Sequence, residues 1–291
     1  MQATVLAIIT GALALTSQAG FAQTRAGGTA IHTPITLVFS RQGPNGMTDL
    51  PMGVHRIPDS NVIISGHQKG GAIGVLFGPI GMLVQSTANA EGGTGKIRNV
   101  EDDLHFDAAA KAEELTAGLI ADEKYLPFFT LSPKGGSTMT VTPYVLITFV
   151  NEAEARPYII IKTKLDTNGT EENPKTVKYF CCEGKPMPLS GAGGLTENSG
   201  AALKALLASE LEIAVQVMLQ DRSQPYLRDK QKRVSVRGFL PFVGKPLTFK
   251  GYDLGRHREY SLIGFPGGGL VFGGVNIAEP GSLEIESLPA K

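Results

Sequence analysis

Four glycines recur at every fourth position in the stretch from Gly66 to Val84, which reads GHQKGGAIGVLFGPIGMLV. They are Gly66, Gly70, Gly74 and Gly78. In a helix, residues four apart lie on one face, so these glycines would form a ridge without side chains. Large apolar residues flank the ridge and charge is nearly absent. Such a surface needs a close-fitting neighbour, and we expect the ridge to be a helix-packing or assembly contact.

The four-residue repeat resembles the glycine-zipper motif of bacterial envelope proteins, over residues 66–84 only. That resemblance implies close helix packing through small residues. A membrane-spanning helix is the least favoured arrangement, because His67 and Lys69 leave only about 15 uninterrupted residues where a span needs about 20. Pro79 would also kink a helix. We expect a buried hairpin or close-packed helix, with an oligomer contact as the first alternative and membrane insertion as the second.

The first 22 residues have the pattern of a secretory signal peptide. An apolar run from Val5 to Leu15 is followed by small residues, and cleavage is expected after Ala22. The run is too short to span a bilayer. No Lys or Arg precedes it, so a buried N-terminal helix is the alternative. The signal predicts a periplasmic or secreted bacterial protein.

Charge is balanced over the whole chain, with 27 basic and 27 acidic residues. This balance gives no bulk attraction to polyanions, so we expect no nucleic-acid partner. The hydrophobic content of 42% and charged content of 19% are typical of a folded chain.

The two cysteines, Cys181 and Cys182, are adjacent. Exported proteins normally pair cysteines to brace long loops, which neighbouring residues cannot do. In a strand the two side chains would point to opposite faces of the sheet. Two buried thiols are therefore expected, and a thiol pair that forms an intermolecular or vicinal redox disulfide is the alternative.

The middle of the chain predicts a helix, three strands and a second helix. The first helix should start at Asp102 or Asp103 and end near Lys124. Segments rich in β-branched and aromatic residues predict the three strands, and their short connections indicate an antiparallel meander. These strands are Met139–Val150, Tyr158–Thr167 and Val177–Cys182.

A stripe with helical spacing predicts the second helix, capped by Asn198 or Ser199 and running to about Gln220. Its members are Leu203, Leu206, Leu207, Glu210, Leu211, Ala214, Val217 and Met218. We expect this stripe and the first helix to cover one side of the sheet.

The regions before and after these helices and strands are predicted to be β structure. Strands are expected at Ile31–Phe39, Val54–Ile57 and Asn61–Ser65, before the glycine-rich stretch. After the second helix, turn signals recur about every ten residues, which indicates a small all-β C-terminal domain. Its expected strands are Val234–Phe239, Leu247–Phe249, Tyr260–Gly264, Leu270–Phe272 and Leu283–Ile285, with a hairpin tip at residues 256–259.

The fold class predicted is therefore α+β: an antiparallel three-stranded meander flanked by two helices, plus the small all-β C-terminal domain. The domain boundaries expected are a signal peptide at 1–22, an N-terminal β region with the glycine-rich segment at 23–98, a helix–meander–helix domain at 99–225 and the β domain at 226–291.

Common catalytic and metal-binding motifs are missing. The five histidines are scattered and form no HExxH, and the segment around Ser190 does not form GxSxG. We therefore expect no catalytic residues, no metal site and no cofactor. This favours a non-catalytic envelope protein that binds, assembles or has a structural role through its glycine-rich segment, by self-association or with another envelope component. An exported hydrolase or transferase with a site assembled from separated residues is the alternative, and a membrane-active protein is the third.

Overall fold

The computed structural model describes residues 33–43, 54–65, 101–133, 136–151, 153–166, 176–224, 232–242, 246–265 and 274–289. The predicted signal peptide and the glycine-rich stretch at 66–84 lie outside these residues. So does the strand expected at Leu270–Phe272. These three expectations stay predictions, and so do the boundaries at residues 22 and 98.

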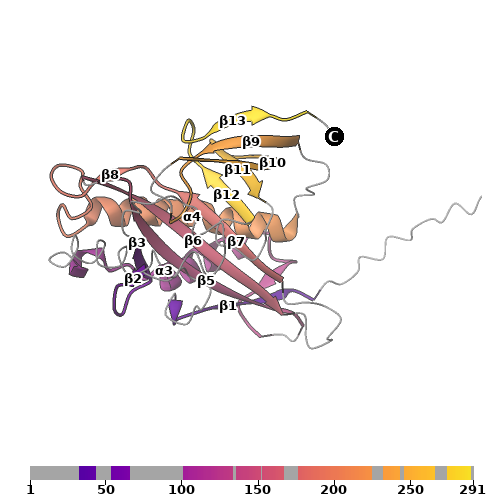
Figure 1. The fold of residues 1–291 in the computed structure, drawn as a ribbon. Coiled ribbons are helices and arrows are strands. Elements are labelled where there is room, and N and C mark those ends of the chain that lie inside the picture. Colours follow the sequence, from indigo (N-terminus) through magenta and orange to yellow (C-terminus); the bar gives the residue numbers. More distant parts are fainter. Residues whose placement is uncertain are drawn as a thin grey trace, which may run out of the picture. The chain divides into compact units, whose positions relative to one another are not determined.

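The α+β class is confirmed: a mixed sheet of 13 strands is combined with two α-helices in the described part of the chain (Figure 1). The strands are β1 (Ile35–Phe39), β2 (Val54–Arg56), β3 (Val62–Ser65), β4 (Phe129–Thr130), β5 (Thr138–Phe149), β6 (Glu154–Asp166), β7 (Thr176–Glu183), β8 (Met187–Pro188), β9 (Lys232–Gly238), β10 (Leu247–His257), β11 (Tyr260–Phe265), β12 (Gly274–Ala278) and β13 (Glu284–Ser287). Their order is β13-β9-β10-β11-β12-β7-β6-β5-β1-β4, while β2, β3 and β8 attach beside this path.

The long strands β5, β6 and β7 form the centre of the sheet and pair antiparallel in chain order. Alternation along β6 sets the two faces: Ile159 and Ile161 point toward the helices, and Ile160 belongs to the opposite core cluster. β6 begins at Glu154, before the predicted Tyr158, and so includes Arg156. The sheet continues beyond these three strands on both sides, so no separate three-stranded sheet is present.

The helix α3 (Ala108–Ile120) packs against β5 and β1. It starts later than predicted, because the Phe106 N–H donates to Ser60 Oγ (3.2 Å) and the chain leaves the helical path there. Residues 101–104 form a short 3₁₀ helix instead. The cap of α3 is Asp107, whose side chain accepts from the Ala110 N–H at 2.8 Å.

The helix α4 (Ala201–Ser223) lies along β6 and β7 and also contacts α3 (Figure 1). Its apolar stripe is buried against the sheet as predicted, with Leu203, Leu207 and Leu211 in the main core. The predicted caps are wrong, since the N-cap is Gly200 and no side chain caps the helix.

The C-terminal strands belong to the same sheet, which corrects the expectation of a separate all-β domain. β12 pairs parallel with β7, with Gly274 opposite Tyr179. Gly274 has a φ of +122°, and a Cβ there would lie 2.3 Å from the Tyr179 carbonyl oxygen, so only glycine fits this approach. Turn spacing predicts hairpins such as β10–β11, where His257 pairs with Tyr260, but it does not specify which earlier strand receives β12.

No helix in the described part of the chain combines the length and apolar character that crossing a bilayer needs.

Candidate functional site

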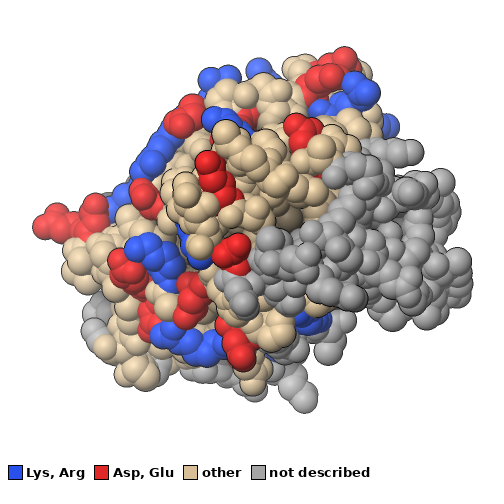
Figure 2. Space-filling view, turned by 90° about the vertical axis from the view of Figure 1, so that its left-hand side faces the viewer, with Lys and Arg blue, Asp and Glu red and all other residues tan. Residues whose placement is uncertain are grey.

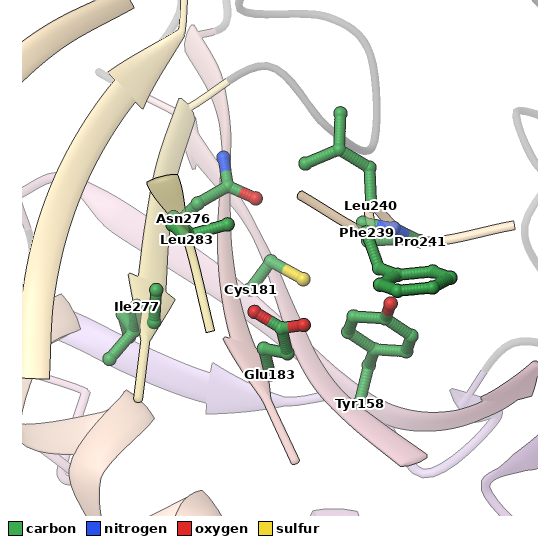
Figure 3. Close-up of a pocket in the computed structure, with 10 residues that line it drawn as sticks. Tyr158, Cys181, Glu183, Phe239, Leu240, Pro241, Asn276, Ile277 and Leu283 are labelled. Atoms are coloured by element: carbon green, nitrogen blue, oxygen red, sulfur yellow. The ribbon is translucent and has the colours of Figure 1, made fainter. Parts of the chain in front are cut away.

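A small cavity lies where β6, β7 and β12 meet the segment that follows β9 (Figure 3). Its volume is about 10 Å³, room for about one water molecule. Polar groups come from Tyr158, Cys181, Glu183 and Asn276. The apolar lining is Phe239, Leu240, Pro241, Ile277, Ala278 and Leu283.

Strand alternation places the polar groups on one face. Tyr158 on β6 is paired with Glu183 on β7, and Cys181 lies two residues before Glu183 on the same side. The side chain of Asn276, from β12, points toward the same space (Figure 3). The cavity therefore joins the central strands to the C-terminal ones.

Glu183 is the most connected charged group of the site. Arg156 Nη1 donates to its Oε1, and Ser282 Oγ donates to its Oε2 at 3.0 Å. Burial raises the pKa of Glu183 to about 7, against the opposing effects of Arg156 and Ser282 and with a smaller increase from Glu279. A pKa of about 7 lies near neutrality, and side chains from β6 and from the turn before β13 hold this carboxyl group.

The Arg156 guanidinium is buried between its partner and an aromatic ring. Its Cζ lies 4.7 Å from the centroid of the Phe239 ring, a cation–π contact. Its Nε has no hydrogen-bond partner among the described groups. Arg156 therefore depends on the Glu183 carboxylate for compensation of its charge.

Tyr158 and Cys181 present neutral groups to the cavity. Burial raises the pKa of the Tyr158 hydroxyl and of the Cys181 thiol well above their ordinary values, and the nearby Glu183 carboxylate raises both further. The Tyr158 hydroxyl is buried and has no hydrogen-bond partner among the residues that the structure describes. Since the thiolate is the reactive form of cysteine, this thiol is a poor nucleophile.

Glu210 reaches the same end of β7 from α4, on the other face of the sheet. It is fully buried, and neither carboxylate oxygen has a hydrogen-bond partner in the described part of the chain. A Cβ on Gly184 would lie 2.7 Å from Glu210 Oε1, so glycine is needed beside it. Burial raises the pKa of Glu210 well above its ordinary value, and Glu279 and Glu183 add to this, while Lys185 opposes it.

Sequence reasoning missed this cluster as a site, although one signal was present. Glu210 is the charged member of an otherwise apolar stripe. Arg156, Glu183 and Ser282 carry no comparable signal, because strand pairing and the β12–β13 turn bring them together from distant positions.

The residues predicted as sites are not brought together by the described structure. Gly66, Gly70, Gly74 and Gly78 lie outside the described residues. Cys181 and Cys182 are both buried with free thiols, and they belong to core clusters on opposite faces of the sheet.

Neither a metal site nor a catalytic arrangement of histidines is found in the described ranges. No group of three or more His, Cys, Asp or Glu side chains there could hold a metal ion. His257 lies between two amides of α4, with Nε2 at 3.0 Å from Gln216 Oε1 and Nδ1 at 3.2 Å from Gln220 Oε1.

Comparisons with protein-family models, with curated proteins and with solved structures found no match to this chain.

Proposed function

We propose that the chain is an exported, non-catalytic cell-envelope protein that binds or assembles through its glycine-rich segment. The observation that supports this most is the closure of the cavity at β7. Tyr158, Cys181 and Glu183 are 1%, 2% and 5% exposed. A space for about one water molecule admits no substrate of ordinary size.

The surface adds a second, weaker support. On the face shown in Figure 2, basic and acidic side chains of the described residues are interspersed. A mixed surface of this kind gives no long-range steering toward a partner of one charge sign. Recognition would then depend on shape and close packing, which the ridge predicted from the sequence at residues 66–84 would provide.

Substitution of Gly74 by Leu tests the proposal, because it places a large side chain on the ridge. We expect Gly74→Leu to change the oligomer size or the membrane partition of the full chain, measured by size-exclusion with light scattering and by vesicle flotation. Gly71→Leu is the matched control, since Gly71 lies off the four-residue repeat. The proposal fails if Gly74→Leu keeps the oligomer size, solubility and membrane partition of the parent.

An exported hydrolase or transferase is the second candidate, and one contact favours it. Ser282 Oγ lies 3.0 Å from a carboxylate that is itself paired with Arg156, at the junction of central and C-terminal strands. A carboxylate that receives a serine proton would activate that serine as a nucleophile. A fluorophosphonate probe distinguishes the candidates: labelling of the parent that Ser282→Ala abolishes favours the enzyme, and absence of labelling favours the binding protein.

A further inference from the structure

Three carboxyl groups from three parts of the chain lie near the end of β7, with Glu183 on one face of the sheet and Glu210 on the other. Glu183 ends that strand, Glu210 comes from the middle of α4 and Glu279 directly follows β12. A Cβ on Gly184 would lie 2.7 Å from Glu210 Oε1, and the Nζ of the next residue, Lys185, lies 3.7 Å from Glu279 Oε1, so the three acidic side chains surround residues 183–185.

Cations compensate two of these carboxylates and leave the third alone. Arg156 is paired with Glu183, and Lys185 Nζ lies 3.7 Å from Glu279 Oε1. Lys185 is 72% exposed, so water screens its charge. Glu210 has no hydrogen-bond partner and no ion pair among the described residues, and the nearby Glu279 and Glu183 disfavour its ionisation.

We propose that Glu210 is a proton-operated latch, which keeps the C-terminal strands closed on the central sheet while it holds a proton and loosens them when the proton leaves. An ionised carboxylate that is fully buried and lacks a hydrogen bond is costly, and two neighbouring carboxylates increase the cost. Water entry relieves that cost, and it requires an opening at this end of the sheet.

The opening is expected at residues 279–287, because these are the least buried neighbours of the cluster. All four residues of β13 are exposed and β13 pairs with β9, whereas Glu183 of β7 and Glu210 of α4 are buried. Two polar contacts hold this segment near β7: Ser282 to Glu183 and Lys185 to Glu279. The backbone pairing of this segment is with β9 and not with β7, so these two contacts, together with the packing of Leu283, join it to the central strands.

The direction of the pH response follows from the raised pKa of Glu210. The closed state binds the proton more tightly than an open state, whose carboxyl has the ordinary pKa of 4.5. Closure is therefore fully favoured below that value and is lost as pH rises toward the raised pKa. The latch works in this way whatever the glycine-rich stretch binds.

Hydrogen exchange of the full chain, followed by mass spectrometry over a pH series and corrected for intrinsic exchange rates, tests the latch. In the parent, we expect the protection of residues 274–289 to fall with rising pH, by up to about tenfold per pH unit within the window. Glu210→Gln imitates the protonated form and should keep this segment protected throughout. Glu212→Gln is the matched control, because Glu212 lies on the same helix and pairs with Arg258 at the surface.

Two outcomes overturn the latch: a fall in protection that persists in Glu210→Gln, or a parent whose protection at 274–289 does not change. Loss of the response in Glu183→Gln but not in Glu210→Gln would assign the proton to Glu183 and also overturn it. If Glu210→Gln does not fold, carbon-13 NMR of glutamate carboxyls in the parent decides. A carboxyl that titrates far above pH 4.5 and is still present in Glu183→Gln, together with shifts in residues 279–287, supports the latch, and its absence refutes it.

Discussion

Ser282 Oγ donates a hydrogen bond of 3.0 Å to Glu183 Oε2, although the two residues are 99 positions apart in the chain. The bond ties the β12–β13 turn to the end of β7, next to the parallel pairing of β12 with β7. Through the pairing of Glu183 with Arg156, it also reaches β6. The C-terminal strands are thus joined to the central sheet by a backbone ladder and by a buried polar chain.

The stability of the fold should depend on pH through Glu183. Its pKa is about 7 in the folded chain and 4.5 as the ordinary value, so the native state holds more protons between these values. Stability from this group is therefore complete below about pH 4.5 and is lost as pH rises through about 7. The expected loss is about 3 kcal/mol, and Glu183→Gln should remove it.

Urea unfolding at about pH 4.5 and about pH 8 measures this difference. Part of the fall with rising pH will remain in Glu183→Gln, because Glu210 contributes in the same direction. Glu284→Gln is the control, since Glu284 is an exposed carboxylate paired with Arg237. A Glu183→Gln variant that keeps the full pH slope of the parent would contradict the assignment.

The central strands and α4 could be predicted because their signals are local. β-branched runs identified β5, β6 and β7 to within a few residues, and the helical stripe on α4 identified its buried face. The start of α3 could not be predicted from its acidic entry, since a tertiary hydrogen bond from Phe106 to Ser60 fixes the break. A tertiary contact of this kind can override a local capping signal.

The buried polar cluster could not be predicted, because long-range strand pairing creates it. Nothing near Glu183 in the chain indicates that Ser282 will reach it, and a glutamate at the end of a strand is ordinarily solvated. Glu210 alone carried a local signal, as a carboxylate inside an apolar stripe. The pairing of β12 with β7 could not be predicted for the same reason. Alternation of apolar and polar residues specifies which face of the sheet a side chain lies on, and not which strand is its neighbour.

Substitution by alanine should destabilise the fold at Gly184 and stabilise it at Gly118. A Cβ on Gly184 would lie 2.7 Å from Glu210 Oε1 and 2.9 Å from the Pro157 carbonyl oxygen, so Gly184→Ala should destabilise the fold by about 1–3 kcal/mol. Gly118 lies in α3 with nothing within 4 Å of an added Cβ. Gly118→Ala should stabilise by about 0.5–1 kcal/mol. Urea unfolding of both variants checks the pair, and a Gly184→Ala variant at least as stable as the parent would contradict the close approach of Glu210.

The two thiols should be unreactive until the chain unfolds. Burial raises the pKa of both Cys181 and Cys182 well above the ordinary value, and nearby carboxylates raise both further. We expect Ellman's reagent to modify the native chain slowly and both thiols to react promptly in guanidinium chloride. Rapid reaction of the native chain would show an open site. Absence of free thiols in the unfolded, unreduced chain would show a disulfide instead.

A second ion pair, partly buried, joins β7 to the end of α4. Lys178 Nζ lies 2.6 and 2.7 Å from the two carboxylate oxygens of Asp221, which is 3% exposed. Asp221 lies in the last turns of α4, where the helix dipole disfavours a negative charge, so the fold depends on Lys178 to compensate it. Lys178→Met leaves that carboxylate buried and unpaired, which should cost about 3–5 kcal/mol. Lys111→Met removes an exposed pair with Glu114 and should cost less than about 1 kcal/mol.

Addition of Asp221→Leu to Lys178→Met should restore part of the lost stability in urea unfolding, because it removes the unpaired carboxylate. If the double variant is no more stable than Lys178→Met alone, the cost comes from lost packing of the lysine stem and not from the buried carboxylate.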